Sequence, residues 1–420
     1  MILRARLVLP ISQNPIQDGA VAISRGRIVA VGRWRALKSS VRGRVSDLGE
    51  VILMPGLVNA HCHLDYTDFA GQFPPPKLFT DWIKLIVTAK SQCSLPDYAG
   101  AWKRGAEMLL RTGTTTVADI EAVPELLPSA WGSTPLRVFS FLELIAITGR
   151  RKPAVLLDEA LGRVKKLKNK RSFIGLSPHA PYSTGPELLH LSAEAARERG
   201  LRLCVHVAES AVEYEMFKRG RGEMFRWLKR GSRDMADCGL RTPMEHLGNS
   251  GALGQNLLAV HANYLGRNDP TLLGTSGTHV VHCPRSHHYF RHRKFPLRKL
   301  LKARVNVCLG TDSLASVYKK RRQTLELSMF DEMRALADAQ SFVRPQGIVQ
   351  MATVNGATAL GMQGAIGELR PGAYADVIAI PFSGAARNLY SAVLQHQGKV
   401  SASMIGGEWA IKPTSKSGTA

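Results

Sequence analysis

From residue 57 onward, short apolar segments alternate with longer segments of helical spacing. The candidate strands are residues 57–60, 115–120, 136–144, 173–178, 201–207, 257–263, 279–283 and 305–312. Helical spacing is clear at 97–111, 154–168, 186–199 and 213–230, and Gly113 and Gly200 stand where helix ends are expected. Because strands that alternate with helices form parallel sheets, eight such units predict an α/β fold, a (β/α)8 TIM barrel.

Both ends of the chain have a different character. Residues 1–50 have the pattern of short β segments joined by tight turns. After a predicted helix or helix pair at 345–362, β character returns. We therefore expect a small β-sandwich domain built from both chain termini, residues 1–54 together with 365–420. The barrel is expected to occupy residues 55–364.

Composition excludes several classes of protein. With 45% hydrophobic and 21% charged residues, the 420-residue chain has the balance of a globular protein. No apolar run of about 18 residues is present, so no membrane span is expected. The N-terminal segment lacks a long apolar core and is interpreted as a strand, not a signal peptide. The six scattered cysteines, without a C-x-x-C pair, favour a reducing, cytoplasmic location over a disulfide framework or zinc ribbon.

The formal net charge of +23 has two interpretations. It is typical of nucleic-acid-binding proteins, and it also occurs on solvated basic surfaces. The lysines and arginines are spread along the chain, and no helix-turn-helix, RRM or KH signature accompanies them. We favour the solvated surface, so no nucleic-acid partner is expected.

Histidines and one aspartate end several of the predicted strands. His61 and His63 are two apart, so in a strand they point to the same side. His206, His261 and Asp312 end the fifth, sixth and eighth strands. A single H-x-H is weak evidence, since buried structural histidines are common. Five potential ligands at the ends where barrels carry their active sites indicate a metal centre.

A series of short motifs runs through the chain in a fixed order. They are PGLVNAHCHLD (55–65), SPHAPYS (177–183), HVAES (206–210), HANYL (261–265), HCPRS (282–286) and GTDSLAS (310–316). Two later segments, ATVNGATALGM and GELRPGAYADVI, extend the series almost to the end of the chain. Together they resemble the amidohydrolase superfamily, in its branch of nucleoside and nucleobase deaminases and related chlorohydrolases.

The resemblance implies a single divalent metal ion. Its ligands in mononuclear members correspond to His61, His63, His206 and Asp312. Three imidazoles and one carboxylate suit Zn2+, with Fe2+ as the alternative. Dinuclear members usually carry a modified lysine or a carboxylate at the fourth strand. That strand ends here in LSPH (176–179), without a lysine, so one metal is expected.

The same resemblance implies the catalytic residues. Asp312 takes a proton from the metal-activated water, and His261 positions and polarises that water. Glu209 completes an H-x-x-E motif and is expected to protonate a ring nitrogen, then the departing amine. The alternative for Glu209 is an exposed carboxylate at a helix start. These roles suit hydrolytic deamination of an amino-substituted ring with release of ammonia.

Four further residues are candidates for substrate binding. His179 ends the fourth strand, where relatives contact the substrate. Trp82 either covers the substrate ring or packs in the core, and Glu143 either binds a sugar hydroxyl or supports another side chain. Arg285 either pairs with a substrate carboxylate or braces its loop. Its neighbour His287 stands where many relatives have an asparagine, which puts the conformation of this loop in doubt.

The substrate stays open at this point. Loops 149–152, 285–293 and 319–322 are basic, which is either a solvated surface or attraction for an anionic substrate. The leading hypothesis is a small heterocyclic substrate, an adenosine derivative such as aminodeoxyfutalosine or S-adenosylhomocysteine. The alternatives are a guanine deaminase or an s-triazine hydrolase that releases chloride or alkylamine, and more remotely a nucleic-acid-binding protein. The sequence also leaves open whether the protein forms a homodimer.

Overall fold

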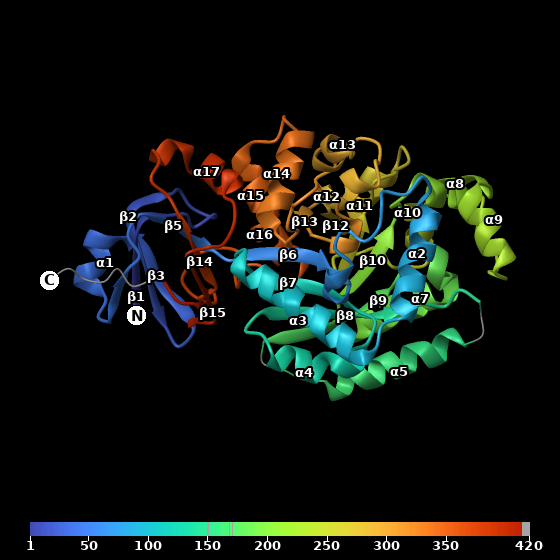
Figure 1. Ribbon diagram of the computed structural model, residues 1–420, viewed down its shortest axis with the longest axis horizontal. Coiled ribbons are helices and arrows are strands. Elements are labelled where there is room, and N and C mark those ends of the chain that lie inside the picture. Colours follow the sequence, from blue (N-terminus) through green and yellow to red (C-terminus); the bar gives the residue numbers. More distant parts are fainter. Residues whose placement is uncertain (149–150, 168, 170, 414–420) are drawn as a thin grey trace.

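Two sheets organise the chain, one at each end of the molecule (Figure 1). The computed structural model describes residues 1–148, 151–167, 169 and 171–413. The larger part contains eight strands in chain order: β6 (Leu57–Cys62), β7 (Thr114–Glu121), β8 (Arg137–Leu144), β9 (Ser172–Pro178), β10 (Leu203–Val207), β11 (Leu257–His261), β12 (His279–His282) and β13 (Val307–Leu309).

All neighbouring pairs of these eight strands are parallel. The sheet closes through a parallel bridge between Cys62 and Asp312. Backbone hydrogen bonds reinforce the closure, from the Asp312 N–H to the His61 carbonyl and from the His63 N–H to the Asp312 carbonyl, each 3.1 Å long. The predicted (β/α)8 barrel is confirmed.

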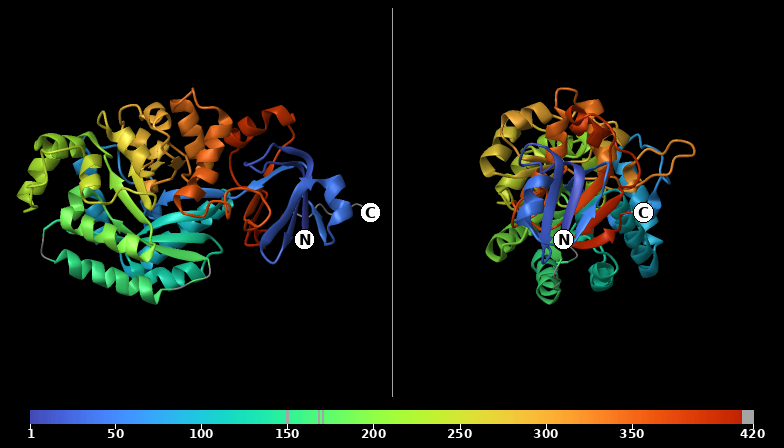
Figure 2. Two further views of the ribbon diagram at one scale, coloured as in Figure 1. Left: turned by 180° about the vertical axis from the view of Figure 1, so that it is seen from behind. Right: turned by 90° about the vertical axis from the view of Figure 1, so that its left-hand side faces the viewer.

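Helices surround the barrel and connect its strands (Figures 1 and 2). The α-helices are α1 (Trp34–Ser40), α2 (Phe79–Ser91), α3 (Leu95–Arg111), α4 (Leu127–Gly132), α5 (Pro153–Lys166), α6 (Pro181–Thr184), α7 (Pro186–Arg199), α8 (Ala211–Arg219), α9 (Glu223–Arg230), α10 (Pro243–Asn249), α11 (Asp269–Ser276), α12 (Pro284–Tyr289), α13 (Leu297–Lys302), α14 (Met329–Ala339), α15 (Pro345–Met351), α16 (Val354–Ala359) and α17 (Leu389–Gln395). Short 3-10 helices are η1 (Leu64–Phe69), η2 (Pro124–Leu126), η3 (Leu314–Ser316) and η4 (Ala386–Asn388). In the described part of the chain, no helix is long and apolar enough to cross a membrane.

The helical predictions differ from the structure in detail. The stretch predicted at 213–230 is two helices, α8 and α9, because Gly220 (φ 59°) and Gly222 (φ 103°) adopt a backbone that breaks the helix. The segment at 345–362 is the helix pair α15 and α16. The helix predicted at 154–168 is α5, and its last residue lies outside the described residues.

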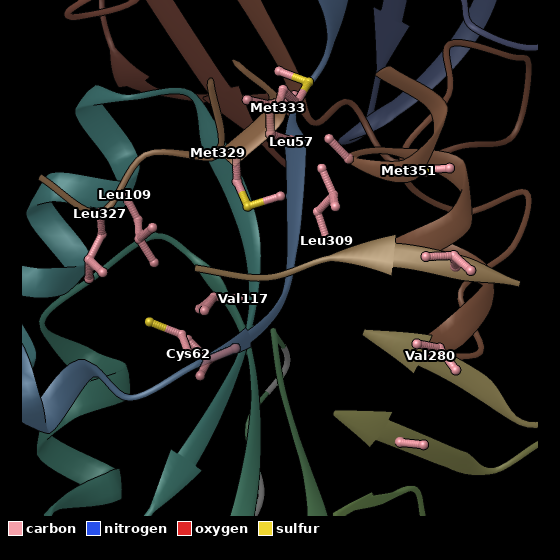
Figure 3. Close-up of a cluster of buried hydrophobic side chains, with 14 of the residues drawn as sticks. Leu57, Cys62, Leu109, Val117, Val280, Leu309, Leu327, Met329, Met333 and Met351 are labelled. Atoms are coloured by element: carbon pink, nitrogen blue, oxygen red, sulfur yellow. The ribbon is translucent and has the colours of Figure 1, made fainter. Parts of the chain in front are cut away.

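Alternate residues of the strands pack outward against the helices. Figure 3 shows Leu57 and Val117 of β6 and β7 in one cluster with Leu109 of α3 and with Met329 and Met333 of α14. All five side chains are fully buried. Each such side chain contributes roughly 1.5–3 kcal/mol when it leaves water. This packing fixes the strand ends that carry the candidate site.

The second sheet combines strands from both termini. Its members are β1 (Ile2–Val8), β2 (Ile16–Ser24), β3 (Arg27–Arg33), β4 (Val45–Asp47), β5 (Val51–Pro55), β14 (Val377–Pro381), β15 (Ala402–Ile405) and β16 (Glu408–Ile411). β14 pairs with β5, so the last part of the chain lies beside the first. Side chains of both parts share one buried core. The predicted small β domain is confirmed, and its bounds at 54 and 365 stay a proposal.

The small sheet contacts the N-terminal end of the barrel. Only Gly56 separates β5 from β6. Arg137, at the start of β8, pairs with Asp376 at 3.1 Å, and each side chain is only 2% exposed. The C-terminal strand ends therefore point away from the small sheet, as the direction of β6 in Figure 1 shows.

Candidate active site

Five polar side chains meet at the C-terminal end of the barrel. His61 comes from β6, His206 from β10 and His261 from β11, whereas His63 follows β6 and Asp312 follows β13. Asp312 Oδ1 lies 3.6 Å from His61 Nε2 and 3.7 Å from His63 Nε2. The Nε2 atoms of His63 and His206 are 3.2 Å apart. All five residues are buried.

An irregularity near the end of β6 aims His61 and the following His63. Val58 and Ala60 belong to the apolar cluster that fills the barrel, so strict alternation would next turn Cys62 inward. The pairing of β6 with β7 shifts register between Asn59 and Cys62. Cys62 then packs in the outer cluster, while His61 and His63 face the site. A bulge that re-aims side chains is common beside active sites.

Two of the five residues have left-handed backbone. His261 has φ 73° and Asp312 has φ 53°. Such a conformation costs a residue other than glycine roughly 1–2 kcal/mol. Val260 faces the barrel interior, so the left-handed turn lets the next residue, His261, reach the same centre. Surrounding contacts must hold this strain, which is often found at functional sites.

The cluster has the chemistry of a metal site. His61, His63 and His206 form one set of mutually close ligand atoms, and His61, His261 and Asp312 form another. His61 Nε2 is buried without a hydrogen-bond partner in the described residues. An orphaned imidazole nitrogen aimed at other ligand atoms fits a bound cation.

Contacts behind the cluster orient two of the predicted ligands. The Nδ1 atom of His206 lies 3.0 Å from the carbonyl oxygen of His179, so its Nε2 is left for the cluster. Ser316 Oγ donates to Asp312 Oδ2 at 2.9 Å. Burial, with the neighbouring imidazoles, lowers the pKa of His206 and His63 well below the usual range. Both rings are therefore neutral at pH 7, the state that binds a metal.

Glu209 lies beside this cluster. Its Oε1 atom is 3.5 Å from His261 Nε2. Burial raises the pKa of Glu209 well above its ordinary value, and the charges of Asp312 and Glu213 raise it further. The buried placement disagrees with the alternative of an exposed carboxylate at a helix start. A protonated carboxyl in this position can donate a proton.

These groups open into a cavity of about 260 Å³. Its lining includes His63, His206, Glu209, His261 and Asp312 of the site described above. Three of the four candidate substrate-binding residues, Trp82, Glu143 and His179, also line it. Apolar residues of α2 and α9 and of the segment after β8 form the rest of its wall.

Trp82 and His179 line the cavity and also contact other side chains of the protein. Trp82 packs edge-on against Phe290, with ring centroids 5.2 Å apart, so it both lines the cavity and belongs to an aromatic cluster. The Nδ1 atom of His179 is 2.6 Å from Ser183 Oγ. Burial lowers the pKa of His179 to about 3, which keeps the ring neutral.

Two residues of the cavity were missed at the level of sequence. Tyr66 stacks on His63, with ring centroids 4.8 Å apart. Lys90 Nζ lies 2.9 Å from Tyr66 Oη and 3.7 Å from Asp65 Oδ2. The helical spacing of Trp82, Ile86 and Lys90 is the signal that would have placed Lys90 on the same face as Trp82.

Arg285 is not brought into the cavity. Its Nη1 atom donates to the Glu326 carbonyl at 2.9 Å and lies 3.6 Å from Asp331 Oδ2. Its backbone N–H donates to Glu332 Oε2 at 2.9 Å. This placement supports the bracing role and gives no support to substrate contact.

In the part of the chain that the structure describes, the basic loops do not contribute lining residues to the cavity. Gly149 and Arg150 lie outside the described residues. Arg151 pairs with Glu159 at 2.5 Å. Attraction of an anionic substrate by these loops stays a prediction.

Comparison with known proteins agrees with this geometry. A model of the amidohydrolase family matches residues 52–410. The chain is 32% identical over 389 residues to a 5-methylthioadenosine/S-adenosylhomocysteine deaminase of Syntrophobacter fumaroxidans, covering 87% of this chain and 80% of that protein.

Solved structures of similar fold include two deaminases. One is an adenosine deaminase from Xanthomonas campestris with bound zinc (TM-score 0.82, 24% identity, 98% of this chain and 92% of that chain). The other is Helicobacter pylori aminofutalosine deaminase in complex with methylthio-coformycin (TM-score 0.86, 20% identity, 98% of this chain and 100% of that chain). With the family match over most of its length, the chain belongs to the amidohydrolase family.

Proposed function

We propose that the protein is a metal-dependent aminohydrolase that deaminates an adenosine derivative and releases ammonia. The observation that carries the proposal is the buried carboxyl of Glu209, which lies in the cavity 3.5 Å from His261 and has a raised pKa. Deamination of a purine needs a proton donor at a ring nitrogen, and Glu209 supplies one. The deaminase from S. fumaroxidans supports an adenosine-type substrate.

The proposed ligands of the metal are His61, His63, His206 and Asp312. Three imidazoles and a carboxylate suit Zn2+, with Fe2+ as the alternative. Zinc in the Xanthomonas structure supports the first choice. When bound, the ion would act as a Lewis acid and lower the pKa of a water molecule.

The protein residues then move the protons. His261 holds the attacking water against the ring carbon, and Asp312 accepts the proton that this water loses. Glu209 gives its proton to the ring nitrogen, which makes the carbon electrophilic. The Glu209 carboxylate then takes the proton of the newly added hydroxyl group and passes it to the amino group, so the carbon–nitrogen bond breaks and ammonia leaves. The proton held by Asp312 restores the acid form of Glu209. Water and the aminopurine are thereby converted to the oxopurine and ammonia.

The remaining polar groups of the cavity are proposed to hold the nucleoside. Glu143 offers a carboxylate acceptor and Lys90 an ammonium donor, a pair that suits the hydroxyl groups of a sugar. His179 is neutral and can share a hydrogen bond with the purine edge. Trp82 and the apolar side chains of α2 contact the flat ring and the 5′ substituent.

An ammonia-release screen tests the proposal. Zinc-loaded protein is assayed with adenosine, 5′-methylthioadenosine, S-adenosylhomocysteine, aminodeoxyfutalosine, guanine and cytosine, and with an aminated chloro-s-triazine. We expect turnover of at least one 5′-substituted adenosine above that of guanine. If guanine alone were turned over, the proposed adenosine-type substrate would be wrong. If only the triazine reacted, with release of chloride or alkylamine, the proposed deamination would be wrong.

A cytoplasmic location is also part of the proposal. All six cysteines, at 62, 93, 204, 238, 283 and 308, are free thiols in the structure. Free thiols throughout a chain are typical of reducing compartments. The homodimer and the absence of a nucleic-acid partner stay predictions.

A further inference from the structure

Three successive loops of the barrel mouth are joined behind Glu209. The Ala262 N–H donates to the Val207 carbonyl, and the Tyr264 N–H donates to the Ala208 carbonyl, each at 3.0 Å. These bonds connect the loop after β11 to the loop after β10, which carries Glu209. A side-chain contact from α12 adds the loop after β12 to the same network.

Glu213 fixes the backbone on one side of Glu209. This fully buried carboxylate on α8 accepts the N–H groups of Ala208 at 2.9 Å and of Glu209 at 2.8 Å. Ala208 is left-handed, with φ 51°, a strained conformation for a residue with a Cβ. The two hydrogen bonds to the Glu213 carboxyl group hold the turn in this conformation.

Asn263 fixes the backbone on the other side. Its Nδ2 atom donates to the carbonyl oxygen of Glu209 at 3.0 Å. Two consecutive left-handed residues, His261 (φ 73°) and Ala262 (φ 48°), turn the chain so that Asn263 can reach this carbonyl. Asn263 is buried and is not among the residues that line the cavity.

His287 holds the amide of Asn263. Its Nδ1 atom lies 2.9 Å from Asn263 Oδ1. Because the other end of this amide donates to Glu209, Oδ1 is an acceptor, and Nδ1 of His287 must carry the hydrogen. Burial lowers the pKa of His287 to about 4, so the ring is neutral and carries one N–H.

We propose that His287 is a positioning residue, which acts through Asn263 to hold Glu209 at the distance from which it transfers protons. The inference rests on the proposed function, since it needs Glu209 as the proton carrier. His287 does not line the cavity, so it is not expected to contact the substrate. Its effect should therefore be on turnover and not on substrate affinity.

Two substitutions of His287 separate the hydrogen bond from the volume of the ring. His287→Phe keeps a flat ring of similar size and removes the donor. His287→Asn places an amide nitrogen close to the position of Nδ1 and keeps the donor. We expect kcat to fall about 10- to 100-fold in His287→Phe, because a small displacement of a catalytic group has effects of that size. We expect His287→Asn to stay within about 3-fold of the wild type, and KM to change less than about 3-fold in both.

His288→Phe is the matched control, because His288 is the next residue of α12 and is exposed. It should leave kcat unchanged. Asn263→Ala should lower kcat as His287→Phe does, and the double variant should lose no more than Asn263→Ala alone, since both act through one contact. Equal kcat in His287→Phe and the wild type, or additive losses in the double variant, would overturn the proposal.

Two further measurements separate this inference from the proposed function. Glu209→Gln is assayed alongside: if it is inactive while His287→Phe is fully active, the positioning role fails and the proposed function stands. Hydrogen exchange of the peptide 207–213 is measured as well. Faster exchange in His287→Phe but not in His288→Phe is expected, even if no substrate in the screen is turned over. If the exchange rate of this peptide in His287→Phe equalled that of the wild type, the proposal that His287 holds the Glu209 loop would be wrong.

Discussion

The cavity has two walls that are built in different ways. The inner wall consists of strand ends, with His206 and Asp312 buried and held by hydrogen bonds from behind. The outer wall consists of α2, α9 and the segment after β8, and it is mainly apolar. At its rim Val87 and Ile145 are exposed to solvent. Directional contacts fix the reacting groups, whereas the outer wall offers contact area, so the two walls should differ in what they control.

The largest loss of activity is expected when one imidazole of the inner wall is removed by substitution. His206→Ala should lower the metal content of the purified protein and reduce ammonia release by about 1,000-fold or more, which is about 4 kcal/mol of activation free energy. Metal analysis and the ammonia assay measure the two effects. His190→Ala, an exposed histidine on α7, is the control and should change neither. If His206→Ala lacked metal but kept full activity, the assignment of the metal ligands would be wrong.

Glu209→Gln should have the next largest effect, with kcat about 100- to 1,000-fold lower and unchanged metal content. The raised pKa of Glu209 also sets the direction in which kcat should change with pH. Because Glu209 donates a proton and burial raises its pKa well above the ordinary value, kcat should be highest below that raised pKa and fall as the pH rises through it.

In Glu209→Gln this alkaline decline should disappear, since glutamine does not titrate. Glu215→Gln on α8 is the matched control, because Glu215 carries a partly exposed carboxylate that pairs with Arg219. A decline that persists in Glu209→Gln would assign the alkaline limb to another group.

A substitution in the outer wall should act on affinity. Trp82→Ala removes an aromatic surface that the ground state and the transition state contact equally, so KM should rise about 10-fold with kcat within about 3-fold. Trp82→Phe keeps an aromatic ring, so its KM should lie between those of the wild type and Trp82→Ala. Steady-state kinetics with a 5′-substituted adenosine measure both constants. A loss confined to kcat would show that the outer wall also positions the reacting groups.

The same division explains how much of the site the sequence predicts. His206 follows Cys204, which fills the barrel, in strict alternation, so its direction could be inferred. Asp312 lies beyond the end of β13 and has a left-handed backbone, so alternation alone does not set its direction. His61 and His63 face the site only because of the irregularity in β6, and His261 only because of its left-handed backbone. These local departures have no signature in residue type, and the resemblance to a family supplied what alternation does not.

The outer wall was harder to predict for a physical reason. Lys90 and Trp82 lie on a helix, whose position over the barrel depends on packing and not on a repeated pattern. The order of the barrel strands follows from the alternation of elements, and all eight predicted strands are present. The break between α8 and α9 depends on two glycines in positive φ, which helical spacing alone does not reveal.

The smallest kinetic effect is expected from Arg285, which tests whether a residue predicted for the cavity belongs to the scaffold. Arg285→Gln should leave kcat and KM within about 2-fold of the wild type, since the side chain contacts Glu326, Asp331 and Glu332 instead of the cavity. It should lower the stability by about 1–3 kcal/mol, because the fully buried Glu332 loses a charged neighbour.

The pH dependence of this loss has a defined direction. Burial raises the pKa of Glu332 to about 8, and Arg285 opposes that rise. A raised carboxyl pKa stabilises the folded state fully below the unfolded value of about 4.5, and this contribution is lost as the pH rises through about 8. Without Arg285 the pKa rises further, so the ionised form becomes more costly. The difference in Tm between wild type and Arg285→Gln should therefore be larger at pH 8.5 than at pH 5.5. A rise in KM with no change in Tm at either pH would instead place Arg285 at the substrate and make the outer wall partly ionic.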